Sequence, residues 1–210
     1  MSFRLPKIYP LTDVGLTGLT HAEQVRRLAK GGALLIQLRD KTSGARDFLE
    51  SAKAAVIAAR ECEVKLIIND RADIAAAVGA DGVHLGQDDL PVAAARELLG
   101  AKAIIGLSTH SLSQAEAATT LGIDYLALGP VFSTRTKDDT APDVGLDGLM
   151  AVRSKVGEFP LVAIGGITVD RALDVLQAGA NSVAVISALL RNAHEITAQT
   201  ARLLHTVSPR

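Results

Sequence analysis

The sequence has no tryptophan, two tyrosines and four phenylalanines, so aromatic residues make up only 3% of it. Ala, Val, Leu and Ile must therefore supply nearly all of the core, within a hydrophobic fraction of 48%. Buried parallel strands and alanine-rich amphipathic helices are typical of such a composition. The scarcity of aromatics favours an α/β protein, and 210 residues are enough for one large core.

Cysteine is also scarce. Cys62 is the only one, which excludes an internal disulfide framework and a paired-thiolate metal site, and no cation beside it would activate the thiol. The sequence contains neither an apolar run of about 18 residues nor an N-terminal apolar segment with a cleavage site. These absences predict a soluble protein of the cytoplasm.

Charge of one sign is not in excess, since 22 Lys and Arg face 23 Asp and Glu, for a net charge of -1. We therefore expect no broad basic field for nucleic acid or for a membrane, and an anionic ligand must meet a local cluster. The expected partners are small molecules. The oligomeric state stays open, with a homo-oligomer as one alternative.

Short apolar runs alternate eight times with longer segments of helical period. The predicted strands are residues 8–12, 34–38, 66–69, 82–85, 104–108, 125–129, 161–164 and 182–186. Thr20 and Ser111 are predicted helix N-caps. A doubly wound open sheet is the alternative, but eight near-equal units without a GxGxxG after the first strand favour a single (β/α)8 TIM barrel over residues 1–210.

Functional residues of such barrels lie where the strands end at their carboxyl side. Arg39 and Lys41 follow the second strand two residues apart, so both side chains can point toward one anion, such as a diphosphate. The alternative is a solvated ion pair. Asp70 and Asp89 follow adjacent strands, and two carboxylates beside phosphates are typical Mg²⁺ ligands. Each could instead cap a helix.

The last two strands predict a second anion site. Gly165-Gly166 follows the seventh strand, Ile186-Ser187 follows the eighth, and barrels often bind phosphate with the backbone at these loops. A glycine pair alone is as often a tight turn. Two anion sites at one barrel mouth favour a two-substrate transferase. The polar stretch 133–145 is too long for a minimal turn and is interpreted as a lid.

Two histidines, His84 and His110, lie at or near strand ends. His84 alternates within the fourth strand, where a buried core role and a chemical role are equally compatible with the pattern. His110 stands at a helix start, and we interpret it as a solvated loop residue.

Seven motifs in order, IQLRDK, IIND, GVHLGQDDLP, IIGLSTHS, DYLALGPVFSTRTK, VAIGGI and AVISAL, resemble the thiamine phosphate synthase family from the first strand to the eighth. The resemblance implies pyrimidine diphosphate ligands Gln37, Arg39, Lys41, Asn69, Ser108 and Lys137. It implies thiazole phosphate ligands Thr134, Thr136, Gly166, Ile186 and Ser187, and Mg²⁺ ligands Asp70 and Asp89. Asp88 receives no role. Ser133 stands where many members have Pro.

In the family's mechanism the diphosphate leaves first and the thiazole nitrogen then attacks the cationic pyrimidine methylene. The resemblance makes Arg39, Lys41 and Lys137 the catalytic residues, because they neutralise the departing pyrophosphate. A thiazole tautomerase of the same superfamily is the main alternative. A phosphate-binding barrel isomerase or epimerase would need an acid/base pair that this rim lacks, and a catalytically silent sensor barrel is a further alternative.

Overall fold

The computed structural model describes residues 4–134 and 142–208. Its strands are β1 Ile8–Pro10, β2 Leu35–Leu38, β3 Lys65–Asn69, β4 Gly82–Leu85, β5 Ile104–Thr109, β6 Tyr125–Leu128, β7 Leu161–Ile164 and β8 Ser182–Val185. All neighbours pair in parallel in the order β1-β8-β7-β6-β5-β4-β3-β2. A bridge between Leu11 and Gln37 joins the β1 and β2 ends. The predicted (β/α)8 barrel is therefore confirmed.

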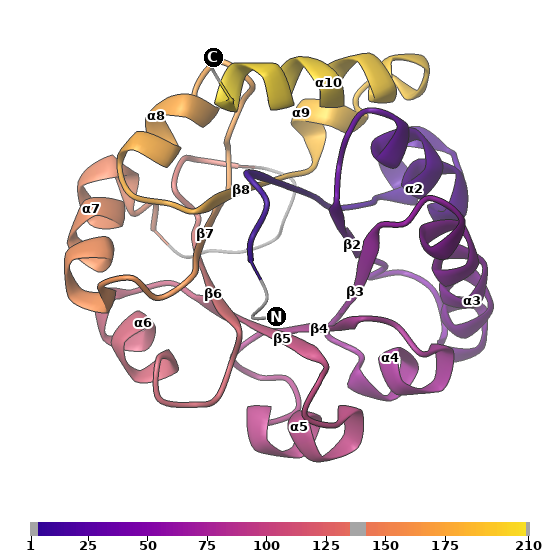
Figure 1. The fold of residues 1–210 in the computed structure, drawn as a ribbon, viewed down its shortest axis with the longest axis horizontal. Helices are drawn as coiled ribbons and strands as arrows, with labels where there is room; N and C mark the ends of the chain where they lie inside the picture. Colours follow the sequence, from indigo (N-terminus) through magenta and orange to yellow (C-terminus); the bar gives the residue numbers. More distant parts are fainter. Residues whose placement is uncertain (1–3, 135–141, 209–210) are drawn as a thin grey trace.

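Helices surround the ring of strands on the outside (Figure 1). They are α1 Val14–Thr17, α2 His21–Lys30, α3 Ala45–Glu61, α4 Ala72–Val78, α5 Val92–Leu99, α6 Leu112–Ala118, α7 Gly145–Val156, α8 Ala172–Gln177, α9 Ser187–Leu190, the 3-10 turn η1 Ala193–Glu195 and α10 Ile196–Val207. Thr20 and Ser111 accept backbone N–H groups at the starts of α2 and α6, so both predicted caps are confirmed. No helix in these ranges is long and apolar enough to cross a membrane.

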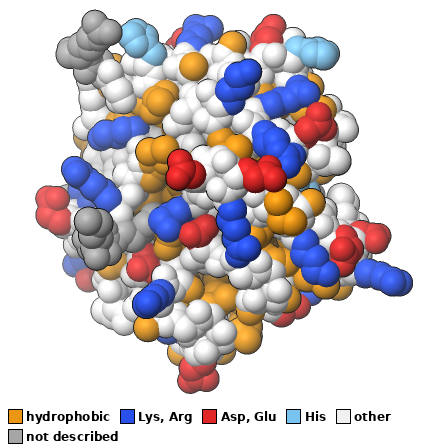
Figure 2. All heavy atoms as spheres, turned by 45° about the vertical axis from the view of Figure 1, so that its right-hand side comes forward, with side chains coloured by type: hydrophobic (Ala, Val, Ile, Leu, Met, Phe, Trp, Pro, Cys, Tyr) orange, Lys and Arg blue, Asp and Glu red, His pale blue; other side chains and the backbone are white. Residues whose placement is uncertain are grey.

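Alanine allows the helices to lie close to the sheet. The inner face of α3 consists mainly of Ala52, Ala55, Ala58 and Ala59, all buried together with Phe48. Small side chains let a helix approach a strand closely, and the branched residues of the strands fill the remaining space. The outer surface is charged with both signs, and Figure 2 shows basic and acidic side chains interspersed on one face.

Gly106 leaves room for an aromatic ring inside the barrel. It pairs in register with His84 on β4 and with Tyr125 on β6. A Cβ atom at Gly106 would lie at a forbidden distance from the Tyr125 ring, 2.4 Å from its hydroxyl oxygen. The lack of a side chain at this position therefore lets Tyr125 extend across β5.

We expect Gly106→Ala to lower the free energy of unfolding by about 1–3 kcal/mol, because the ring must leave its rotamer. Urea unfolding measures this change. Gly44→Ala is the control, since Gly44 has φ -64° and no atom of the described residues lies within 4 Å of an added Cβ. Gly44 is the N-cap of α3, so its substitution should cost no more than about 1 kcal/mol. Equal stability of the two variants would contradict the close packing of Tyr125 on Gly106.

Candidate active site

A charged cleft opens at the carboxyl ends of β2 to β5. Its lining consists of Arg39, Lys41, Asn69, Asp70, Gly86, Gln87, Asp88, Asp89, Ser108, His110 and Gln114. Five of the six predicted pyrimidine diphosphate ligands and both predicted metal ligands thus come together from four different strand ends. All of them line this cleft except Gln37. Gln37 is the deeper one, since it is 3% exposed and donates from Nε2 to the Tyr9 hydroxyl at 3.1 Å.

The two cations of the cleft differ in environment. Lys41 is exposed, and its Nζ lies 2.5 Å from Oδ2 of Asp70. The Arg39 side chain is only 13% exposed, and Oδ2 of Asp13 lies 3.5 Å from its Nη1. Nε of Arg39 is buried with no hydrogen-bond partner among the described residues. A buried guanidinium N–H without an acceptor is costly, so Arg39 is poised for an anionic ligand.

The Asp70 and Asp89 carboxylates are not helix caps, so that alternative is wrong. Helix α4 begins after Arg71 without a side-chain cap, and Asp89 Oδ2 accepts the Gly86 N–H at 2.6 Å. Asp70 has φ 62°, a left-handed conformation that aspartate tolerates better than most residues. Burial raises the pKa of Asp89 above its ordinary value, and the neighbouring Asp70 raises it further. The two like-charged carboxylates therefore repel each other.

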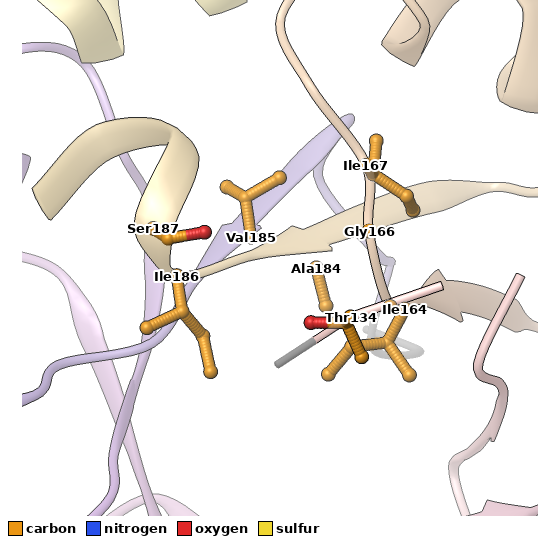
Figure 3. Close-up of a pocket in the computed structure, with 9 residues that line it drawn as sticks. Thr134, Ile164, Gly166, Ile167, Ala184, Val185, Ile186 and Ser187 are labelled. Carbon is orange, nitrogen blue, oxygen red and sulfur yellow. The ribbon is translucent and has the colours of Figure 1, made fainter. Parts of the chain in front are cut away.

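A second, glycine-lined pocket lies at the ends of β7 and β8 (Figure 3). Its lining consists of Thr134, Ile164, Gly165, Gly166, Ile167, Ala184, Val185, Ile186 and Ser187. The hydroxyl groups of Thr134 and Ser187 point into the space between them (Figure 3). Four of the five predicted thiazole phosphate ligands thus line one pocket. Thr136 and Lys137 lie outside the described residues, as does the rest of the stretch 135–141 in the predicted lid.

The glycine pair has a steric cause. Gly165 has φ 101° and Gly166 has φ 63°, and an added Cβ at Gly166 would lie 2.6 Å from the Ser133 carbonyl oxygen. The strand-six loop therefore packs directly on the Gly165-Gly166 backbone. Only glycine allows both the left-handed conformation and this close approach.

A bridging pocket connects the two sites. It shares Ser108 and His110 with the charged cleft, and it shares Thr134, Ile164 and Gly165 with the glycine-lined pocket. His110 was interpreted as a solvated loop residue, which is wrong. It is only partly exposed, its Nδ1 lies 2.6 Å from the Gly129 carbonyl oxygen, and it lines both the charged cleft and the bridging pocket. Its place directly after β5 was the signal that could have identified it.

Further cations lie outside the glycine-lined pocket, and sequence reasoning missed them. An outer cleft shares Thr134, Gly166, Ile167 and Ser187 with that pocket and is also lined by Arg171, Arg191 and Arg202. Cζ of Arg171 lies 4.6 Å from the centroid of the Phe132 ring, a cation–π contact. Both anion sites thus have arginine nearby.

The sequence pattern of the family described as Thiamine monophosphate synthase matches residues 8–189. The chain belongs to this family. It is 46% identical over 203 residues to "Thiamine-phosphate synthase" of Chloroflexus aurantiacus, covering 96% of this chain and 93% of that protein. The same name is carried by a relative from Syntrophomonas wolfei, 46% identical over 197 residues, with 93% of each chain covered.

A solved structure, "Thiamine phosphate pyrophosphorylase from Pyrococcus furiosus", superposes with a TM-score of 0.86 at 39% identity, covering 96% of this chain and 95% of that chain. The predicted family and its transferase class are confirmed by these relatives. The tautomerase alternative is not favoured, because these relatives carry the synthase or pyrophosphorylase name.

Proposed function

We propose that the protein joins 4-amino-2-methyl-5-pyrimidinylmethyl diphosphate to 4-methyl-5-(2-phosphoethyl)thiazole, or its carboxylate, giving thiamine phosphate and pyrophosphate. One observation carries this proposal: two anion sites at the mouth of one barrel are joined by a bridging pocket. Such a site holds two phosphorylated substrates with their reacting ends facing each other. We propose that residues 1–210 act as one catalytic domain in the cytoplasm.

The charged cleft is proposed to hold the pyrimidine diphosphate. Nε of Arg39, which has no hydrogen-bond partner in the part of the chain that the structure describes, supports a phosphate contact there, and Lys41 lines the same cleft. Asn69, Ser108 and the deeper Gln37 are proposed to hold the pyrimidine ring. Lys137 is proposed to reach the departing pyrophosphate from the strand-six loop.

The glycine-lined pocket is proposed to hold the thiazole phosphate. Its ligands would be Thr134, Thr136, Gly166, Ile186 and Ser187, and the paired hydroxyls of Thr134 and Ser187 support this role (Figure 3). A phosphate accepts hydrogen bonds from hydroxyls and from backbone N–H groups, which are what this pocket offers.

Asp70 and Asp89 fit a divalent cation. The two carboxylates are like charges in one cleft, and the pKa of Asp89 is raised although Lys41 pairs with Asp70, so one ammonium does not balance both of them. Among the described residues, no three acidic, histidine or cysteine side chains are placed so that they could hold a metal ion together, so substrate and water oxygens would complete the coordination. A bound Mg²⁺ would supply positive charge against the diphosphate oxygens.

The transfer needs no protein nucleophile. The bond between the methylene carbon and the diphosphate oxygen breaks, and its electron pair leaves with pyrophosphate. Arg39, Lys41 and Lys137 stabilise that developing charge, while the aminopyrimidine delocalises the positive charge of the methylene. The lone pair of the thiazole nitrogen then forms the new carbon–nitrogen bond. The walls of the bridging pocket exclude water that would trap the cation.

The test is incubation of the protein with both phosphorylated substrates and Mg²⁺. We expect thiamine phosphate and pyrophosphate to appear in equal amounts, measured by mass spectrometry and by a pyrophosphate assay. Omitting either substrate should abolish both products. Rearrangement of the thiazole phosphate without pyrophosphate release would instead identify a tautomerase and overturn the proposal.

A further inference from the structure

A chain of buried polar side chains runs through the barrel interior beneath the charged cleft. Gln37 Nε2 donates to the Tyr9 hydroxyl at 3.1 Å, and the Tyr9 and Tyr125 hydroxyl oxygens lie 2.9 Å apart. The Tyr125 hydroxyl lies 3.0 Å from Nδ1 of His84, whose Nε2 lies 2.9 Å from Oγ of Ser108. Because β1 and β6 are not neighbours in the sheet, the contact between the tyrosines crosses the barrel.

The packing fixes the shape of this chain. The rings of His84 and Tyr125 stack with centroids 5.5 Å apart and planes 18° apart, and the Tyr9 ring meets Tyr125 edge-on at 5.8 Å. Gly106 provides the space for the Tyr125 ring. Tyr9 and Tyr125 are 1% and 0% exposed, and His84 is 6% exposed. The hydrogen bonds therefore stand in a rigid, water-poor interior.

The hydrogen bonds have a direction. Burial raises the pKa of Tyr9 and of Tyr125 well above the ordinary value, so each phenol carries its proton at neutral pH. With Gln37 Nε2 as donor to Tyr9, every hydroxyl proton finds an acceptor if Tyr9 donates to Tyr125 and Tyr125 donates to Nδ1 of His84. His84 then carries its proton on Nε2 and donates to Ser108.

This order of donors and acceptors determines which groups Gln37 and Ser108 present to a ligand. The Ser108 oxygen accepts from His84, which leaves the Ser108 proton to donate to a ligand. The side-chain nitrogen of Gln37, Nε2, donates to Tyr9, which leaves the side-chain oxygen, Oε1, as an acceptor for a ligand. An aminopyrimidine offers an amino donor beside a ring nitrogen acceptor. An acceptor and a donor held at fixed positions match that pattern.

We propose that Tyr9, Tyr125 and His84 are positioning residues that fix the hydrogen-bonding pattern of Gln37 and Ser108 toward the aminopyrimidine. This inference rests on the proposed function, in which Gln37 and Ser108 contact the pyrimidine diphosphate. The three residues do not touch the reacting atoms. They act by holding two ligands in the state that the ring requires.

Tyr125→Phe tests the middle of the chain, because it removes the hydroxyl and keeps the ring. We expect kcat/KM for the pyrimidine diphosphate to fall about tenfold, and KM for the thiazole phosphate to stay unchanged. Ser182→Ala is the control, since it removes another buried hydroxyl, on β8, outside the chain. Unchanged kcat/KM in Tyr125→Phe, or equal losses toward both substrates, would overturn the proposal.

The roles of the two ring nitrogens of His84 can be tested separately. The amide of His84→Gln can approach the position of Nε2 and keep the donor to Ser108, whereas the shorter amide of His84→Asn reaches only the position of Nδ1. We expect His84→Gln to retain several-fold more kcat/KM for the pyrimidine diphosphate than His84→Asn. Equal losses in two folded variants would show that the bond to Ser108 carries no positioning role.

A spectroscopic readout on the unaltered protein keeps the proposal testable if a variant does not fold. The sequence has two tyrosines, and both lie in the chain. In protein labelled with ring-¹³C tyrosine, pyrimidine diphosphate with Mg²⁺ should shift both tyrosine signals, whereas thiazole phosphate alone should shift neither. No shift with the pyrimidine diphosphate would overturn the inference. Binding is read without turnover, so failure to form thiamine phosphate would count against the proposed function separately.

Discussion

Replacing Asp70 and Asp89 together by Asn is expected to reduce kcat about 1,000-fold, a loss of about 4 kcal/mol of transition-state stabilisation. The substitution keeps the size of both side chains and removes the charges proposed to hold Mg²⁺ against the diphosphate. It also removes the ion pair between Lys41 and Asp70. Steady-state rates across a Mg²⁺ titration measure the effect, and a chelator should abolish turnover of the unaltered enzyme.

Asp88→Asn is the matched control, because it removes the same charge from the exposed neighbour of Asp89. Asp88 lines the same cleft, but its side chain is exposed and has no proposed role, so its substitution should change kcat by less than about threefold. Full activity of the double Asn variant in chelator would show that the metal assignment is wrong.

Arg39→Ala is expected to weaken binding of the pyrimidine diphosphate about 10- to 100-fold, the usual range for a lost charge-assisted hydrogen bond of about 1.5–3 kcal/mol. The Arg39 side chain lines the charged cleft, and its Nε has no partner within residues 4–134 and 142–208, whereas the glycine-lined pocket lies across the bridging pocket. Binding of the thiazole phosphate should therefore remain within about twofold. Calorimetric titration of each ligand alone measures both constants.

Two variants sharpen this experiment. Arg39→Lys keeps the charge and loses the planar fork, so it should recover only part of the affinity. Arg26→Ala removes an exposed arginine paired with Glu61 on the outer surface and should leave both constants unchanged. An equal loss for both ligands in Arg39→Ala would contradict the separation of the two sites.

The barrel was predictable because each strand is short, apolar and followed by a helical period. The predicted strand bounds differ from the observed ones by no more than two residues. Thr12 was predicted as the end of the first strand and lies two residues beyond β1, where its N–H still donates to the Gln37 backbone carbonyl while its hydroxyl lies 2.7 Å from Nδ1 of the buried His21. Ile186 was predicted within the last strand, but its ψ of -83° turns the chain into α9. Hydropathy does not encode such local hydrogen bonds and turns.

The candidate site was predictable as far as it follows strand ends. Position alone selected Arg39, Lys41, Asp70 and Asp89 as residues of one rim. Contacts across the barrel were not predictable. The bond between Tyr125 and His84 joins residues 41 apart, and the bond between the tyrosines joins residues 116 apart. Both depend on the space that Gly106 leaves for the Tyr125 ring, and the hydrophobic periodicity of the sequence does not indicate that space.

Closure of the barrel has a dynamic consequence for the charged cleft. Between β1 and β2 the ring is joined by the Leu11–Gln37 bridge. The Thr12 N–H also donates to the Gln37 backbone carbonyl at 2.9 Å, and the Arg39 N–H donates to the Thr12 hydroxyl at 3.3 Å. A seam with so few backbone pairs should open at lower free energy than a full ladder, so we expect amide hydrogen exchange to be fastest there. Because Arg39 belongs to this seam, we expect an anion bound to Arg39 to slow exchange across it.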